Sequence, residues 1–270
     1  MKCFGIILFC SLFIAAAPQT KDDHYRIVKN TSFTNGEHLT YYAHYGWITA
    51  AEGEVITDEN ISSVNGRPCY KVDVYGQTTK FFDVIAKVRN HWGTFIDTAA
   101  IIPQKFYRYI DEGSYKRNEL MEYDHENDSL FVHTLDLETI KLKRIDPYAV
   151  KDNIQDVLSG FYYLRTVDFD VMSTGEIISI NGFYKNKAFD FKVRYEGKDE
   201  IKTKLGKIKA LKIVPIMPKN TIFNGENSIT IWLSDDKNKI PLRVKTEMFI
   251  GSIKLDISSA TGLKNRLNKV

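Results

Sequence analysis

The stretch Leu39-Thr40-Tyr41-Tyr42-Ala43-His44-Tyr45-Gly46-Trp47 separates into two interleaved sets of side chains with a period of two residues. Every second residue from position 39 onwards is apolar or aromatic. A period of two is typical of a β-strand, in which successive side chains point to opposite faces of a sheet. We therefore predict a strand here, with one face against a core.

The same alternation recurs at residues 70–74, 191–196 and 201–205. Turn signals separate such runs: Asn35-Gly36, Asn65-Gly66, Asn181-Gly182, Glu196-Gly197 and Asn224-Gly225. Aromatic residues make up 13% of the chain and suit the half-buried surface of a sheet. Many short strands with such turns predict a mainly β protein built on a large curved antiparallel sheet or half-barrel.

Residues 152–165 break this pattern. Their apolar members are Ile154, Val157, Leu158, Phe161, Tyr162 and Leu164. Most of this set keeps the spacing of one face of a helix. Asp152 is the expected N-cap, and Gln155 would complete a capping box. We predict one central amphipathic helix packed against the sheet.

A faint internal repeat lies on either side of this helix. Trp92 is followed by Asp97 and then by Ile102-Pro103, and Trp232 by Asp235-Asp236 and then by Ile240-Pro241. Each copy indicates a hairpin whose second strand opens with proline, a position where no ladder hydrogen bond is lost. The repeat suggests two similar sheet halves joined through the helix.

The N-terminus has the order of a secretory signal peptide. Lys2 precedes an apolar run over residues 4–16, and the small residues up to Ala17 precede a polar stretch. The run is shorter than the roughly 20 residues that a transmembrane helix needs. We predict a cleaved signal peptide over residues 1–17 and a soluble exported protein without a transmembrane segment.

The rest of the chain divides into a flexible N-terminal segment (18–30), a single β-rich domain (31–260) and a polar C-terminal tail (261–270). Cys3 and Cys10 would leave with the signal peptide, so Cys69 alone remains and no intramolecular disulfide can form. An extracellular eukaryotic protein would more often carry disulfides. This favours the periplasm or cell surface of a Gram-negative bacterium.

Catalytic signatures are missing from the sequence. It contains no G-x-S-x-G elbow, no H-E-x-x-H pair and no phosphate-binding glycine loop. Cys69 is interpreted as a small buried hydrophobe, and residues 124–128 as a solvated turn rather than a metal site. We predict no enzymatic activity, no cofactor and no metal. The net charge of +3, with mixed signs, also argues against nucleic-acid binding.

Aromatic residues are the main candidates for a functional surface. Those expected on the concave side of the sheet are Tyr45, Trp47, Trp92, Phe161, Tyr162, Tyr163 and Trp232. Apolar walls with few polar groups form most small-molecule pockets. We take all of them except Tyr163 as candidate ligand-binding residues, with packing in the core as the alternative for most.

Several stretches together resemble the exported bacterial family known as domain of unknown function 3108. They are FTNGEHLTY (33–41), YGWI (45–48), AAE (50–52), DVLS (156–159), YLR (163–165), IKT (201–203), GKIKA (206–210), Pro215, WLSDD (232–236) and IP (240–241). They occur in the family's order and span most of the mature chain. The family supplies no established activity and no catalytic residues.

A more distant similarity is to the periplasmic lipoprotein carriers of the Lol system, whose late hairpin also combines Trp, an Asp turn and a proline-led strand. In that fold a curved sheet and helices enclose a cavity for acyl chains. The resemblance implies that this protein binds a lipid or other apolar ligand in a half-barrel. The alternative is a module without a cavity that contacts another envelope protein or a glycan.

A hydrolase of envelope polymers is a third hypothesis. It would require His44 or His91 to converge with a carboxylate and a hydroxyl in a cleft, since nucleophilic catalysis needs a hydroxyl held next to a base.

Overall fold

The computed structural model describes residues 25–216, 228–247 and 251–270. Its strands are β1 (His38–Tyr45), β2 (Ile48–Val64), β3 (Arg67–Thr78), β4 (Val88–Asp97), β5 (Pro103–Glu112), β6 (Tyr115–Asp124), β7 (Ser129–Leu135), β8 (Leu142–Ala149), β9 (Ile177–Tyr184), β10 (Lys187–Thr203), β11 (Gly206–Pro215), β12 (Ile229–Ser234), β13 (Pro241–Glu247) and β14 (Ser252–Thr261). The helices are α1 (Lys80–Asp83), α2 (Val157–Leu164) and the 3-10 helix η1 (Phe169–Val171).

These strands form one antiparallel sheet in the order β8-β7-β6-β5-β4-β3-β2-β1-β14-β13-β12-β11-β10-β9. The chain runs as a meander from β1 to β8, crosses through α2 to the opposite edge, and returns as a second meander from β9 to β14. Pairing of β1 with β14 joins the two halves. The prediction of a large curved antiparallel sheet is confirmed.

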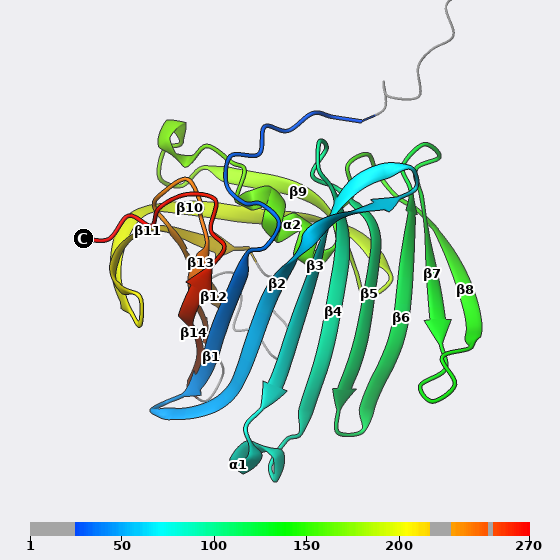
Figure 1. Ribbon diagram of the computed structural model, residues 1–270, viewed down its shortest axis with the longest axis horizontal. Helices are drawn as coiled ribbons and strands as arrows, with labels where there is room; N and C mark the ends of the chain where they lie inside the picture. The colour runs from blue at the N-terminus through cyan, green and yellow to red at the C-terminus, as the bar shows by residue number, and fades with distance from the viewer. Residues whose placement is uncertain (1–24, 217–227, 248–250) are drawn as a thin grey trace, which may run out of the picture.

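The sheet curls around α2 without closing into a barrel. Figure 1 looks onto the outer face of β1–β8, with α2 behind this wall and β9–β11 crossing beyond it. Strands β8 and β9 are the two edges, and no backbone ladder joins them among the described residues. The rings of Tyr148 and Phe183 meet across this gap with centroids 5.1 Å apart. The architecture is therefore a half-barrel.

Helix α2 lies at the meeting point of the hydrophobic core. Leu164 packs in a cluster with Val193, Tyr162 in a cluster with Phe33, and Leu158 against the cluster that contains Phe106. A helix that is apolar on several sides is stable only when other elements surround it. The concave sheet provides that enclosure.

The helix is shorter than the sequence predicts. Asp156, not Asp152, is the N-cap, and Ser159, not Gln155, completes the capping box. Gln155 is instead extended: its N–H donates to the Asn181 carbonyl (2.8 Å) and its carbonyl accepts from the Phe183 N–H (2.9 Å). The backbone of Gln155, which the local pattern assigns to the helix, therefore pairs with the edge of β9 instead.

Both predicted proline-led hairpins are present. Pro103 opens β5 after β4, and Pro241 opens β13 after β12. Similar hydrogen bonds close the two turns, from the Asp97 N–H to the Ile102 carbonyl (2.8 Å) and from the Ser234 N–H to the Ile240 carbonyl (2.9 Å).

The described parts of the N-terminal and C-terminal segments are bound to the rest of the protein. The predicted signal peptide (1–17) and residues 18–24 lie outside the described residues. In the rest of the segment predicted to be flexible, Arg26 donates to the carbonyls of Ala100 (2.9 Å) and Ile101 (3.0 Å). In the predicted polar tail, Leu263 and Leu267 pack against a core cluster.

Candidate functional site

The N-terminus of α2 is held by a buried carboxylate. Oδ1 of Asp156 accepts the N–H groups of Leu158 (2.7 Å) and Ser159 (2.8 Å), and Ser159 Oγ accepts the Asp156 N–H (3.0 Å). Oδ2 of Asp156 accepts the hydroxyl of Thr94 on β4 (2.7 Å). These bonds satisfy the helix N–H groups that have no partner within the helix, and they fix α2 to the sheet.

The other end of α2 is held by a buried ion pair. The guanidinium of Arg165 donates to both carboxylate oxygens of Glu37, at 2.6 and 2.7 Å, and its Nε donates to the Asn238 carbonyl at 3.0 Å. Ser32 Oγ donates to the Arg165 carbonyl (2.6 Å). Both side chains of the pair are only 1% exposed, so the pair clamps α2, the segment before β1 and the β12–β13 turn together.

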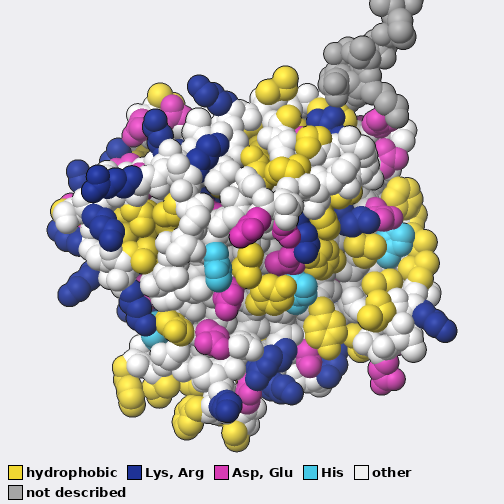
Figure 2. Space-filling model, in the orientation of Figure 1, with side chains coloured by type: hydrophobic (Ala, Val, Ile, Leu, Met, Phe, Trp, Pro, Cys, Tyr) yellow, Lys and Arg dark blue, Asp and Glu magenta, His cyan; other side chains and the backbone are white. Residues whose placement is uncertain are grey.

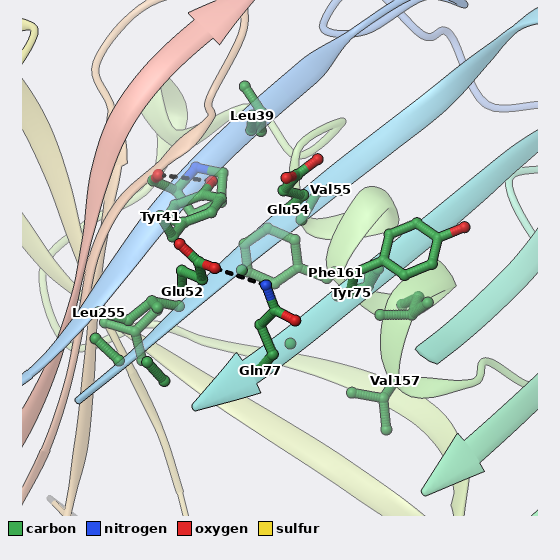
Figure 3. A pocket seen from close by; sticks show the side chains of 18 of the residues that line it. Leu39, Tyr41, Glu52, Glu54, Val55, Tyr75, Gln77, Val157, Phe161 and Leu255 are labelled. Atoms are coloured by element: carbon green, nitrogen blue, oxygen red, sulfur yellow. Dashed lines mark hydrogen bonds between the residues drawn. The ribbon is translucent and has the colours of Figure 1, made fainter. Parts of the chain in front are cut away.

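An apolar cavity of about 460 Å³ remains between α2 and the sheet. Helix α2 supplies Val157, Leu158, Phe161 and Tyr162, and Arg165 follows it. The sheet contributes residues of β1 to β4, β13 and β14, among them Leu39, Tyr41, Val55, Val74, Val244 and Leu255. Figure 3 shows Phe161 and Val157 of α2 facing the strands that carry Tyr41, Val55 and Gln77. The volume lies within the roughly 300–1,000 Å³ of small-molecule pockets.

Small residues on three neighbouring strands make this part of the sheet hollow. Ala43 of β1 lies opposite Ala51 of β2, and Gly53 of β2 lies opposite Gly76 of β3. All four line the cavity. A Cβ atom added to Gly76 would meet no atom within 4 Å, so the space in front of it is open.

Several polar side chains around the cavity are already paired with the protein. The Tyr41 hydroxyl donates to the Pro241 carbonyl (3.0 Å), and the Tyr162 and Thr57 hydroxyls share a hydrogen bond (3.0 Å). Arg165 is bound to Glu37. The cavity therefore offers hydrocarbon and aromatic contacts, and such walls favour an apolar group because binding removes apolar surface from water.

The structure brings two of the six candidate residues together at this cavity. Phe161 and Tyr162 line it. Tyr45 and Trp47 lie at the β1–β2 hairpin, 41% and 90% exposed. Trp92 packs against Phe106 with its Nε1 buried and without a hydrogen-bond partner, and Trp232 Nε1 donates to Asp199 (2.8 Å).

Sequence reasoning missed the small residues and the ion pair. Glycine and alanine at inward positions of consecutive strands were the available signal for a hollow, as at Ala43, Ala51 and Gly53. A charged residue directly after an apolar helix, Arg165, was the signal for a buried partner, although nothing local identifies Glu37 as that partner.

His91 does meet a carboxylate and a hydroxyl, but on the outer face of the sheet. Its Nε2 lies 2.7 Å from Asp73 Oδ1, the same oxygen that accepts the Tyr107 hydroxyl, and the exposed Tyr75 ring stacks on the imidazole. A nucleophile must be hydrogen-bonded to its base, whereas here both groups bind the carboxylate. Burial, followed by the bond to Asp73, also raises the pKa of Tyr107. The cluster lacks a nucleophile–base pair.

Other chemical sites are also lacking in the described ranges. Cys69 is fully buried, and burial raises the pKa of its thiol to about 12, which keeps it protonated. Within residues 25–216, 228–247 and 251–270, no three His, Cys, Asp or Glu side chains gather as metal ligands would. No helix in these ranges has the length and apolarity to span a bilayer.

Asp156 should make the stability of α2 depend on pH. Burial raises its pKa to about 6, against the hydrogen bonds from Ser159 and Thr94 that lower it. Because the folded pKa exceeds the unfolded one, the contribution of Asp156 to stability is complete below about pH 4 and is lost as the pH rises through 6. We expect a loss on the order of 2–3 kcal/mol over this window.

Asp156→Asn keeps an oxygen acceptor for the cap and removes the titration. Urea unfolding at pH 4 to 7 should therefore show the variant becoming more stable relative to the natural protein as pH rises. Asp168→Asn, which changes the exposed cap of η1, is the control. Parallel pH curves for the natural protein and Asp156→Asn would contradict the assignment.

Together, the fold and the cavity define an open β half-barrel that encloses a short helix over an apolar space. The model of the family described as "Protein of unknown function (DUF3108)" matches residues 40–258. The chain belongs to this DUF3108 family. None of the curated protein sequences compared with the chain matches it.

Two solved structures that align with this chain share little sequence with it. A β-barrel-like protein of the DUF1849 family from Brucella abortus aligns with a TM-score of 0.52 and 10% identity, over 87% of this chain and 98% of that protein. The Chlamydia trachomatis protein CT021 aligns with a TM-score of 0.38 and 8% identity, over 89% and 94% of the two chains. The first similarity supports the barrel-like fold alone.

Proposed function

We propose that this protein binds a lipid or another apolar ligand in the cavity between α2 and the sheet, and that it does so as a non-enzymatic, exported protein of the periplasm or cell surface. The observation that carries the proposal is the hollow itself: about 460 Å³, lined by α2 and by small and apolar residues of the sheet. Cores normally pack without voids of this size.

The wall on the α2 side gives the ligand its contacts. Phe161 and Tyr162 present aromatic surface, and Val157 and Leu158 present aliphatic surface. Val157 is 46% exposed although it lines the cavity, so the cavity opens to solvent near the N-terminal end of α2. A ligand can then bury its apolar part and leave a polar end outside.

Export of the protein rests on the N-terminal pattern of Lys2, an apolar run and small residues. It fits a function in the envelope, where lipids and other apolar molecules must cross an aqueous compartment. Carriers of such molecules need an apolar enclosure rather than catalytic groups, which agrees with the paired state of the polar side chains around the cavity.

The test fills the cavity and asks whether the ligand is lost. Gly76→Phe places a ring in the open space, and its cost to folding is small because the new Cβ meets nothing within 4 Å and glycine is a weak strand residue. Lys71→Phe adds the same ring to the outer face of β3, where Lys71 pairs with Asp73 (3.0 Å) and does not line the cavity.

Native mass spectrometry of protein purified from its own envelope, followed by solvent extraction, is the measurement. We expect the natural protein and Lys71→Phe to carry lipid at a defined stoichiometry. Gly76→Phe should lose at least about tenfold in occupancy, equivalent to about 1.4 kcal/mol of affinity. Repeated recovery of ligand-free natural protein, or equal occupancy in both variants, would refute the proposal.

A further inference from the structure

Four of the most exposed apolar side chains lie on two loops at one end of the half-barrel. Trp47, at the tip of the β1–β2 hairpin, is 90% exposed, and Phe81, Val84 and Ile85, in and after α1, are 67%, 89% and 72% exposed. We call these four residues the rim. In Figure 2 the lower end of the molecule, where Figure 1 places α1 and the β1–β2 hairpin, carries protruding hydrophobic side chains with basic ones beside them.

The two loops of the rim are joined to each other. The Thr79 N–H donates to the Ala50 carbonyl (2.9 Å) and the Thr79 hydroxyl to the Thr49 carbonyl (3.4 Å). These bonds connect the start of α1 to the residues just after Trp47. The rim therefore belongs to one surface of the protein.

Polar contacts hold the α1 loop so that its apolar side chains face outward. Asp83 accepts bonds from Arg89 Nη1 (2.9 Å), Arg89 Nη2 (2.6 Å) and the Thr78 hydroxyl (2.6 Å). The bonds from Arg89 and then Thr78 lower the pKa of Asp83 to about 2, so the anchor stays ionised. Phe81, Val84 and Ile85 remain in solvent in spite of the cost of exposing apolar surface.

Residues next to the rim line the apolar cavity. Thr78 and Val88, the residues on either side of the α1 loop, both line the cavity, as do Ala43 and Ala51 near the hairpin. This end of the cavity therefore lies next to the loops that carry the rim.

The chemistry of the rim matches a lipid bilayer surface. Tryptophan and phenylalanine are favoured at the boundary between headgroups and acyl chains. Lys80 and Lys87, both exposed, lie on the same loop, and basic residues next to an apolar surface are attracted to anionic lipids. Trp47 and the apolar side chains of the α1 loop project from two separate loops. Such an arrangement allows both to insert among lipid headgroups.

We propose that the rim docks onto the surface of a membrane that contains anionic lipid, with Trp47, Phe81, Val84 and Ile85 inserted among the headgroups and the cavity mouth facing the bilayer. This proposal rests on the proposed function in one respect: the role of docking would be to transfer an apolar ligand between membrane and cavity. The docking itself is a separate property of the surface.

The test measures binding of the purified protein to vesicles of phosphatidylethanolamine and phosphatidylglycerol by co-sedimentation. The triple variant Trp47→Ser, Phe81→Ser, Ile85→Ser should lose at least about tenfold in vesicle affinity. The matched control is the double variant Ile27→Ser, Val171→Ser, which removes apolar side chains that are 89% and 79% exposed but lie outside the rim. The control should bind like the natural protein.

Two further readouts identify the surface as lipid. The fluorescence of Trp47 should shift to shorter wavelength on vesicles, and Trp47→Phe should abolish that shift while it retains binding. Lys80→Gln with Lys87→Gln should weaken binding to these vesicles severalfold and leave the weaker binding to phosphatidylcholine vesicles unchanged.

Equal vesicle binding by the rim variant and the control would overturn the proposal. So would a natural protein that does not bind vesicles, together with a rim variant whose oligomeric state differs from that of the natural protein. A soluble fluorescent apolar probe separates this proposal from the proposed function. Gly76→Phe should lose the probe and keep vesicle binding, and the rim variant should do the reverse.

Discussion

Glu37→Gln is expected to lower the free energy of unfolding by about 3–5 kcal/mol, because it leaves the buried Arg165 guanidinium without a counter-charge. Arg165 and Glu37 are each 1% exposed and are joined by two hydrogen bonds of 2.6 and 2.7 Å. Removing one charge of such a pair leaves the other desolvated, and water cannot reach it without opening the structure.

Urea unfolding at pH 7 measures this effect. The double variant Glu37→Leu, Arg165→Met should be more stable than Glu37→Gln, since removing both charges avoids the uncompensated one. Glu200→Gln breaks an ion pair with Lys207 in which both partners are largely exposed, and it should cost less than about 1 kcal/mol. A Glu37→Gln protein within 1 kcal/mol of the natural one would show that the pair is not essential for stability.

Gly262→Ala is expected to destabilise the join between the two sheet halves by about 2–5 kcal/mol. Gly262 follows β14 with φ of +65°, and a Cβ atom there would lie 1.9 Å from the carbonyl oxygen of Gly36. The obstacle is backbone, so no side-chain rotation can relieve it. The cost combines overpacking, about 1–3 kcal/mol, with a left-handed conformation, about 1–2 kcal/mol.

Gly113→Ala separates these two contributions. Gly113 has φ of +61°, and a Cβ atom there would meet nothing within 4 Å. It should therefore show only the conformational cost of about 1–2 kcal/mol. Equal losses for the two variants, measured by urea unfolding, would contradict the clash with Gly36.

The strands could be predicted from the sequence because the pattern that marks them is local. The alternation from Leu39 to Trp47 became β1 and the β1–β2 turn, and the prolines at 103 and 241 opened β5 and β13 as predicted. Each of these features depends on neighbours within about ten residues. The end of α2 near Leu164 was also predicted correctly, whereas its beginning was not, because Gln155 pairs with the edge of β9.

The residues that line the cavity could be predicted only in part, because local patterns do not show which strands come together. Phe161 and Tyr162 were found because they lie on the predicted helix, and both line the cavity. Trp47 belongs to the same alternation as Tyr41, but it falls at the hairpin tip, outside the enclosed part of the sheet. Periodicity predicts which face of a strand is buried. It does not predict over what length of the strand α2 and the rest of the sheet bury that face.

The sequence by itself determined a β-rich chain with one central helix and two proline-led hairpins, because steric preferences and hydrophobic periodicity act between near neighbours. Only the tertiary structure decided that β1 pairs with β14, that Arg165 meets Glu37 128 residues away, and that Ala43, Ala51, Gly53 and Gly76 lie side by side to leave a hollow. Those outcomes depend on register and curvature across the whole sheet, which no local pattern encodes.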